Sequence, residues 1–222
     1  MKIIQPTWEF IRPETNEEGV KALRFIESMA RISHKSEERQ TEDSWKRFLK
    51  AVVMEKGDWS VVEHAHATVK FRVNRGVTHE LVRHRLFSYT QESTRFVNGR
   101  KSYPDGLEFI LPATAANDAV LPMKMKRVFE SSESSYLDML DHGIRPQEAR
   151  AVLPNALAST IAVTGNLRSW RHLFVMRTTK ETHPDFRQVT VSLLEAFQTR
   201  IPLLFDDITP GLSQAESIKL PR

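Results

Sequence analysis

The segment from Arg83 to Arg95, RHRLFSYTQESTR, concentrates side chains whose types suit the binding of a polar ligand. It holds three arginines, a histidine, two serines, two threonines and a tyrosine. Guanidinium groups present planar sets of N–H donors that match phosphate and carboxylate oxygens, and hydroxyl and amide groups match sugar oxygens and base edges. The segment therefore predicts a site for a phosphorylated, hydrogen-bonding ligand. The alternative is a basic helix end followed by a solvated loop, which is the more common arrangement for any single Arg or Ser.

Length and composition limit the kinds of protein that this chain can be. With 222 residues and 40% hydrophobic content, we expect a single domain over 1–222 with a substantial core. The 32 Lys and Arg and 28 Asp and Glu are spread along the chain, which suits small anionic ligands better than nucleic acid. The absence of cysteine excludes disulfides, thiolate metal ligands and a cysteine nucleophile. No apolar run approaches the roughly 20 residues of a membrane span, and a secretory signal is lacking, so we expect a soluble cytoplasmic protein.

Apolar periodicity and turn residues predict the elements that position this segment. A capping box at 15–18 starts the first helix, and Gly57 is placed to close the second in a left-handed conformation. A turn at 75–76 leads into a short helix that carries Glu80 and Arg83, and the rest of the segment is predicted to be loop. The other predicted elements are helices at about 15–34, 41–57, 117–142, 166–177 and 184–201, a helix starting at 145, strands at 66–74, 107–111 and 159–164, and a turn at 165–166.

Two histidines, His64 and His66, form a His-x-His pair that raises the question of a metal site. No cysteine is present, and one of the two lies on a predicted strand. We therefore interpret both as structural or hydrogen-bonding residues and predict no metal site.

The spacing within the Arg83–Arg95 segment resembles the signature of flavin-dependent thymidylate synthases, the ThyX family. That signature has Arg-His-Arg, two residues, Ser, four residues, Ser, one residue and Arg. The chain meets it at every fixed position, namely Arg83, His84, Arg85, Ser88, Ser93 and Arg95. Two further segments resemble landmarks of the same family, an Ala-Arg-x-Val-Leu-Pro segment around Arg150 and an Asn-x-Arg helix that runs from Asn166 to Arg177.

This resemblance implies a mixed α/β (α+β) fold with a central, largely antiparallel sheet flanked by helices. It also implies an activity, the methylation of dUMP to dTMP in dTMP biosynthesis. The carbon comes from 5,10-methylenetetrahydrofolate and the hydride from FAD that NADPH has reduced. The expected assembly is a homotetramer with shared active sites. A chain without cysteine cannot use the thiolate attack of an ordinary thymidylate synthase, which agrees with a flavin-dependent route.

The resemblance also implies roles for individual residues. Arg177 and Ser93 are the candidate catalytic residues, with Arg177 expected to stabilise negative charge on the uracil ring. The alternative for Arg177 is a C-terminal helix cap, and on sequence alone the better interpretation of Ser33 is an ordinary loop serine. The substrate-binding residues are expected to be Glu80, Arg83, Gln91, Glu92, Ser93, Thr94, Arg95, Arg150 and Arg177. The cofactor-binding residues are expected to be Ser33, Ser60, Glu63, Arg83, His84, Arg85, Gln91, Asn166, Arg168 and His172.

The chain departs from the family pattern at three positions. Asp58 stands where the family often has His, Gln147 where it often has Glu, and Glu80 where many members have Gln. These departures put in question a catalytic histidine in the 57–64 loop, an acidic side chain at 147 and the substrate contact at 80.

Two other functions remain compatible with the same residues. A serine hydrolase would pair Ser93 with His84, although the chain has no Gly-x-Ser-x-Gly elbow. A basic nucleic-acid-binding module would use the 83–95 and 166–177 segments, because helical spacing places Arg168, Arg171 and His172 on about one side of the second segment.

Overall fold

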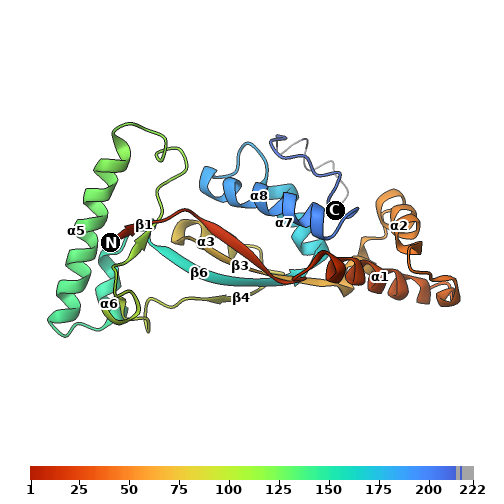
Figure 1. The fold of residues 1–222 in the computed structure, drawn as a ribbon, viewed down its shortest axis with the longest axis horizontal. Coiled ribbons are helices and arrows are strands. Elements are labelled where there is room, and N and C mark those ends of the chain that lie inside the picture. Colours follow the sequence, from red (N-terminus) through yellow and green to blue (C-terminus); the bar gives the residue numbers. More distant parts are fainter. Residues whose placement is uncertain (214–215, 217–222) are drawn as a thin grey trace. The chain divides into compact units, whose positions relative to one another are not determined.

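The computed structural model describes residues 1–213 and 216, and its elements follow one another along the chain as Figure 1 shows. The strands are β1 (Lys2–Ile3), β2 (Thr7–Arg12), β3 (His66–Asn74), β4 (Ser88–Gln91), β5 (Glu108–Phe109) and β6 (Ala158–Asn166). The helices are α1 (Asn16–Ile32), α2 (Ser44–Leu49), α3 (Arg75–Leu81), α4 (Gly99–Ser102), α5 (Leu121–Asp141), α6 (Pro146–Ala149), α7 (Leu167–Arg177) and α8 (Pro184–Arg200). A π-helical stretch at Lys50–Glu55 follows α2, and short 3-10 turns lie at Glu37–Arg39, Trp59–His64 and Arg150–Val152.

Strand pairing gives the fold its class. Four strands form a sheet in the order β2-β3-β6-β4, and the sheet is antiparallel. A separate parallel pair joins β1 to β5, with Lys2 opposite Glu108 and Ile3 opposite Phe109. The predicted mixed α/β fold with a largely antiparallel sheet and flanking helices is thus confirmed.

The chain divides into two compact units, each assembled from three separate segments. The first unit comprises Met1–Trp8, Phe71–Arg83 and Tyr89–Ala162. The second unit comprises Glu9–Lys70, His84–Ser88 and Val163–Arg222. The long strands β3 and β6 therefore each contribute residues to both units.

The core of the first unit forms where α5 packs on β5 and on the residues before β6. Phe109 and Phe129 stack with their ring centroids 4.8 Å apart. Tyr136 is buried beside them, and its hydroxyl accepts a hydrogen bond from the backbone N–H of Gly99 at 3.1 Å. A Cβ at Gly99 would lie 2.6 Å from the Tyr136 ring, so α4 can approach α5 this closely only with glycine at that position.

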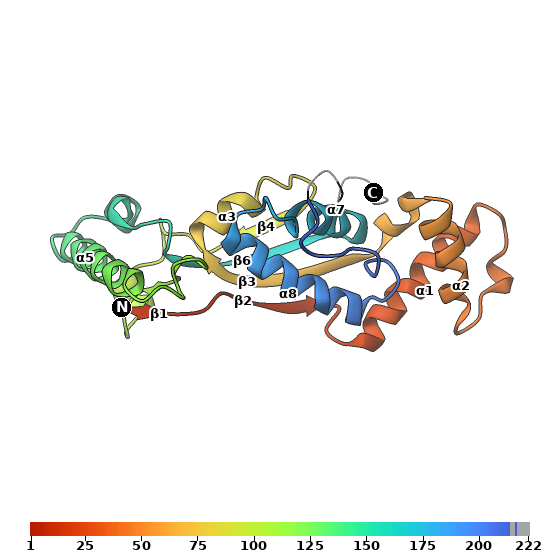
Figure 2. The same ribbon diagram turned by 90° about the horizontal axis from the view of Figure 1, so that it is seen from above.

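The core of the second unit is an aromatic cluster on α7 and α8, which lie side by side in both views (Figures 1 and 2). Phe174 and Phe197 meet edge to face with centroids 4.9 Å apart, and Phe205 lies 5.1 Å from Phe197. Trp170 is fully buried, and its indole N–H donates to the carbonyl of Ala67 on β3 at 3.1 Å. Edge-to-face aromatic contacts and a satisfied indole donor stabilise such a core beyond its buried area. This cluster fixes α7, the helix that carries Arg168 and Arg177.

Two strands pass directly into helices through an asparagine. Asn74 ends β3 and caps α3 by accepting from the Val77 N–H at 2.9 Å, and Asn166 ends β6 and caps α7 by accepting from the Ser169 N–H at 2.8 Å. Both asparagines have extended backbone angles, as N-cap residues typically do. The predicted cap at Asn166 is therefore confirmed.

Several predicted boundaries are wrong for local reasons. Gly165 lies within β6 rather than in a turn, and a Cβ there would come within 2.3 Å of the Phe87 ring. Arg83 lies beyond the end of α3 at Leu81 instead of on the helix. The predicted loop after it contains a strand, β4, which pairs with β6. By contrast, β3 has the predicted bounds, and Gly57 adopts the predicted left-handed conformation with φ of 83°.

Among the residues that the structure describes, no helix is both long enough and apolar enough to span a membrane.

Candidate functional site

The residues expected to bind substrate lie mostly in the first unit, and those expected to bind the cofactor lie mostly in the second. The first unit holds the expected substrate-binding residues except Arg177, namely Glu80, Arg83, Gln91, Glu92, Ser93, Thr94, Arg95 and Arg150. The second unit holds Arg177 and the expected cofactor-binding residues except Arg83 and Gln91, namely Ser33, Ser60, Glu63, His84, Arg85, Asn166, Arg168 and His172.

In the first unit, the end of β4 holds the signature residues against the sheet. The side-chain amide of Gln91 donates to the hydroxyl of Thr78 on α3 at 2.9 Å and to that of Ser159 on β6 at 3.1 Å. Two residues later the chain turns, and the Ser93 hydroxyl accepts from the Arg95 N–H at 3.3 Å. The Arg95 guanidinium lies 5.4 Å from the centroid of the exposed Phe96 ring. Gln91 thus fixes the point from which the exposed part of the signature begins.

Two arginines line a cavity beside this turn. Arg150 donates from Nη1 to the Thr94 hydroxyl at 3.0 Å, and Arg75 at the start of α3 lines the same cavity of about 300 Å³. Burial lowers the pKa of Arg75, and the nearby charge of Arg150 lowers it further. Two guanidinium groups in one partly buried cavity repel each other until an anion neutralises them. The cavity is therefore suited to a phosphate or carboxylate group.

The family resemblance predicts Arg150 at this site, whereas the sequence pattern predicts Arg75 only as a turn residue. Arg75 is the first residue of α3, directly after β3, and its place beside Arg150 depends on a residue 75 positions later in the chain.

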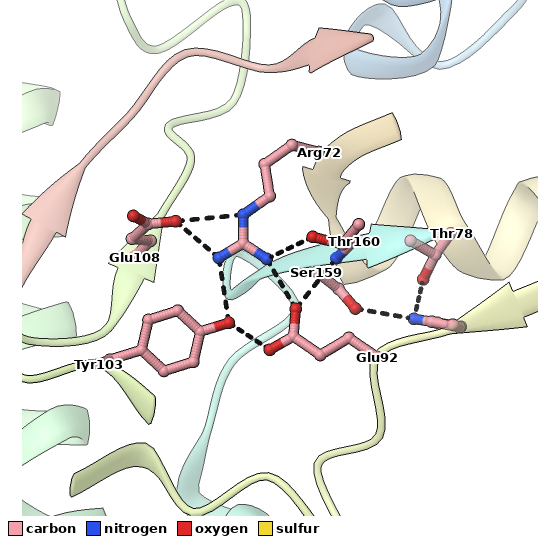
Figure 3. Close-up of polar contacts among 8 residues, drawn as sticks. Arg72, Thr78, Glu92, Tyr103, Glu108, Ser159 and Thr160 are labelled. Atoms are coloured by element: carbon pink, nitrogen blue, oxygen red, sulfur yellow. Dashed lines mark hydrogen bonds and ion pairs between the residues drawn. The ribbon is translucent and has the colours of Figure 1, made fainter. Parts of the chain in front are cut away.

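A second polar group in the first unit surrounds Arg72 on β3, as Figure 3 shows. Arg72 donates to Glu92 at 2.7 Å and to Glu108 at 2.6 Å, and Tyr103 donates to the other carboxylate oxygen of Glu92. Burial alone lowers the pKa of Arg72, but the hydrogen bonds to Glu108 and Tyr103 and the charge of Glu92 outweigh it and raise the pKa overall. Burial, helped by the hydrogen bond to Glu92, raises the pKa of Tyr103 to about 12.

In the second unit, His84 and Arg177 form a direct pair. Arg177 Nε donates to His84 Nε2 at 2.9 Å, and the guanidinium lies 5.4 Å from the Phe186 ring centroid. Burial lowers the pKa of His84 to about 4, with further contributions from the charges of Arg177 and His172. His84 is therefore neutral at pH 7, with its Nε2 lone pair held by the arginine. The arrangement fixes the orientation of the Arg177 guanidinium at the end of α7.

The other two arginines of α7, Arg168 and Arg171, form ion pairs that differ in burial. Arg168 forms an exposed ion pair with Glu63 at 2.6 Å, so two expected cofactor-binding residues contact each other. Arg171 is fully buried, donates to both carboxylate oxygens of Asp207 at 2.6 Å each, and lies 4.3 Å from the Trp59 ring centroid. Helical spacing predicts Arg171 on about the same side of α7 as Arg168. The two arginines nevertheless differ in exposure, because Asp207 and Trp59 supply Arg171 with a buried partner set that helical spacing alone does not reveal.

Ser33 and Ser60 line one open cavity of about 740 Å³ in the second unit. Ser33 donates from its hydroxyl to the carbonyl of Ala30 at 2.9 Å, which orients it at the end of α1. Four basic residues also line the cavity, namely Arg31, His34, Arg39 and Lys56. Asp58 is the one acidic residue among the lining residues. Basic and hydroxyl groups around a volume of this size suit an anionic ligand larger than a single phosphate.

Among the described residues, no group of three or more His, Asp or Glu side chains is arranged to hold a metal ion.

Comparison with protein families places the chain beside known enzymes. Residues 18–203 match the family model described as thymidylate synthase complementing protein. A flavin-dependent thymidylate synthase from Corynebacterium glutamicum is 36% identical over 171 residues, which cover 70% of this chain and 66% of that protein. A flavin-dependent thymidylate synthase from Pyrococcus furiosus is 32% identical over 185 residues, which cover 83% of this chain and 73% of that protein. The match thus spans about two thirds of the length of the corynebacterial relative.

The fold is similar to that of a solved enzyme. A crystal structure of the UMP/dUMP methylase PolB from Streptomyces cacaoi, bound with 5-Br dUMP, superposes with a TM-score of 0.73 at 22% sequence identity. The superposition covers 91% of this chain and 94% of PolB. At this identity the likeness shows that the two chains share a fold.

Proposed function

The chain belongs to the thymidylate synthase complementing protein family, and from that premise we propose that it is a flavin-dependent thymidylate synthase that methylates dUMP to dTMP. Its carbon donor is 5,10-methylenetetrahydrofolate, and its hydride carrier is FAD reduced by NADPH. Residues 1–222 act as a single functional domain, since the family match runs through segments of both units. The observation that carries the proposal is the cavity in which Arg75 and Arg150 lie together.

The cavity suits a nucleotide phosphate because of its positive charge and because polar side chains lie next to it. Two guanidinium groups supply planar donors for a dianion, and Thr94, which already accepts from Arg150, supplies a hydroxyl. The adjacent turn at Ser93 and Arg95 offers a further hydroxyl and a further guanidinium. Burial is the main cause of the lowered pKa of Arg75, and repulsion from Arg150 adds to it. A phosphate would offset that repulsion, so part of the binding free energy comes from charge neutralisation.

The residues of the second unit fit FAD. The 740 Å³ cavity offers the Ser60 hydroxyl and the Arg39 and Lys56 cations for a diphosphate group, and Ser33 also lines it. When bound, FAD supplies the hydride for the methyl group, and the protein supplies binding and orientation. Asp58 also lines the cavity, so the acidic residue at this departure from the family pattern lies close to the proposed cofactor.

Arg177 is our candidate for activating the uracil ring. The chain has no cysteine to attack the ring, so negative charge that develops on the ring must be stabilised by fixed donors. The hydrogen bond from Nε to His84 fixes the plane of the Arg177 guanidinium. A preorganised guanidinium of this kind stabilises developing charge without reorganising during the reaction.

The two competing functions lose support. In a serine hydrolase, His84 would accept the proton of Ser93, but its Nε2 lone pair accepts from Arg177 and its pKa is about 4, so it is a poor base at pH 7. A nucleic-acid-binding module would use an exposed basic face on α7, but Arg171 is buried and Arg168 is paired with Glu63.

Calorimetric titration of the purified protein with dUMP tests the proposal. We expect saturable binding in the native protein, and dTMP formation that requires FAD, NADPH and methylenetetrahydrofolate together. Arg150→Met should weaken dUMP binding about 10- to 150-fold, because a hydrogen bond to a charged group contributes about 1.5–3 kcal/mol.

The matched control is Arg145→Met, which removes the same charge from an exposed residue at the start of α6. It should leave the affinity for dUMP unchanged. A folded native protein that binds neither dUMP nor FAD would contradict the proposed function.

We also propose that the working assembly is a homotetramer with shared active sites, as in the family that the sequence resembles. Light scattering on the active protein measures its mass directly, and a fully active monomer would contradict this proposal.

A further inference from the structure

Arg72 connects the two ends of the segment that carries the proposed nucleotide-binding turn. The segment leaves β4 after Gln91 and ends at Tyr103, the residue that caps the C-terminus of α4. Arg72 donates from Nη1 to Glu92 at 2.7 Å and from Nη2 to the Tyr103 hydroxyl at 3.2 Å, so a single guanidinium holds both ends (Figure 3). Ser93, Thr94 and Arg95 lie between these two points.

The carboxylate of Glu92 is occupied by groups of the protein itself. One oxygen accepts from Tyr103, and the other accepts from Arg72 and from the backbone N–H of Thr160 on β6 at 3.1 Å. A carboxylate accepts about four hydrogen bonds in all, and these three also fix its direction toward β3 and β6. Glu92, which the family resemblance assigned to direct substrate contact, is therefore directed at the sheet.

Arg72 supplies the positive charge that two nearby carboxylates share. Its guanidinium faces two carboxylates, Glu92 and Glu108, and the side chains of all three are less than a third exposed, at 19%, 18% and 27%. Without Arg72, two partly buried negative charges would face each other, and the Tyr103 hydroxyl would lose one of its two hydrogen-bond partners. Because removal of one partner from a buried ion pair leaves an uncompensated charge, the carboxylate of Glu92 would turn toward water.

We propose that Arg72 is a positioning residue for nucleotide binding, which acts by clamping Glu92 and Tyr103 so that the turn at 93–95 is ordered before the phosphate arrives. This inference rests on the proposed function. Ordering a loop in advance improves affinity because less conformational freedom is lost when the ligand binds. The turn includes Thr94, which contacts Arg150, so the clamp also sets one wall of the phosphate cavity.

Arg72→Met tests the clamp, because it removes the charge and the donors but keeps an unbranched apolar side chain. We expect the Kd for dUMP to rise at least 10-fold, with kcat at saturating dUMP within about 3-fold of native and FAD affinity unchanged. A loss of folding would instead change kcat, FAD affinity and dUMP affinity together.

Limited trypsin digestion measures the order of this segment in the absence of nucleotide. The clamped segment contains three exposed trypsin sites, Arg95, Arg100 and Lys101. In Arg72→Met, cleavage at these three sites should be at least 10-fold faster than in native protein, while cleavage elsewhere keeps its native rate. Mass spectrometry of the fragments assigns each cut.

Lys70→Met is the matched control. Lys70 lies two residues earlier on β3, on the same side of the strand, and pairs with Glu9 at the surface with its own side chain 45% exposed. The substitution removes one positive charge from the strand without touching the clamp. It should alter neither dUMP affinity nor trypsin cleavage in the segment.

A second variant covers the case in which Arg72→Met does not fold. Glu92→Gln keeps an oxygen that accepts from Thr160 and removes the charge, so we expect a smaller change in the same direction in both readouts. If native protein binds dUMP but both folded variants match it in Kd and in cleavage rate, the clamp is wrong and the proposed function stands. If native protein does not bind dUMP, the proposed function fails, and faster cleavage in Arg72→Met would still show the clamp.

Discussion

The stability of the protein should fall as the pH is lowered from 7 to 5, and His84 should account for a defined share of that fall. In the folded state, burial and the charges of Arg177 and His172 hold the pKa of His84 at about 4. In the unfolded chain the imidazole has a pKa near 6.5. Below pH 6.5 the unfolded state therefore binds a proton that the folded state refuses, and protonation favours unfolding. Stability present above pH 6.5 is lost progressively and is fully lost below about pH 4.

The size of the effect follows from the two pKa values. A difference of one pKa unit corresponds to about 1.4 kcal/mol, so the full loss is about 3 kcal/mol at low pH. At pH 5 the imidazole would be largely protonated in the unfolded state only, and the loss is about 2 kcal/mol. For a domain of this size, each kcal/mol shifts the Tm by about 2–4 °C, which gives about 4–8 °C between pH 7 and pH 5.

Thermal unfolding at pH 7, 6 and 5 measures this share. His84→Gln replaces the imidazole with an amide whose oxygen can still accept from Arg177 but which does not titrate. Its Tm should therefore fall with pH by about 4–8 °C less than that of native protein. His66→Gln, at the exposed first position of β3, is the control and should follow the native curve. An equal fall of Tm with pH in native protein and in His84→Gln would refute the reasoning, because the imidazole would then titrate alike in the folded and unfolded states.

Two further predictions concern the arginines of α7. Arg177→Ala should keep the fold and FAD binding but reduce dTMP formation by roughly 100-fold, the scale of losing one preorganised donor; near-native turnover would assign the activating role to another residue, with Arg150 next. Arg171→Met should lower the free energy of unfolding by about 3 kcal/mol because Asp207 loses its buried partner. The exposed pair of Arg168 and Glu63 gives the comparison, since Arg168→Met should cost less than about 1 kcal/mol in denaturant titration; similar losses for both variants would contradict the burial argument.

The elements that sequence reasoning identified are those with a strong local pattern. Alternation gave β3 its bounds, because its apolar residues are buried and its polar residues face outward along a single strand. The caps at Thr15 and Asn166 were also found, since a cap is a contact within three residues. The elements that the sequence does not predict depend on partners far away along the chain. The short strand β4 is stabilised by pairing with β6 far along the chain, and no pattern within four residues reveals it.

The candidate site shows the same division. The family spacing identified Arg150 and the residues of the signature, but not Arg75, which shares a cavity with Arg150 only after folding. The sequence predicts no role for Arg72, because its partners, Glu92 and Glu108, lie on other segments. The burial of Arg171 is not predicted, because helical spacing gives direction around the axis and not the identity of a partner such as Asp207.

The direct passage from strand to helix at Asn74 and at Asn166 restricts where this chain can change in length. Without an intervening loop, the phase of each helix is set by the register of the strand before it. An α-helix turns about 100° per residue, so one residue inserted at Asn166 would rotate Arg177 away from His84 by more than a quarter of a turn. A residue inserted between 110 and 120, where the chain has no regular element before α5, would change no such phase. Insertions and deletions should therefore be tolerated in that connection and rejected at the two asparagines.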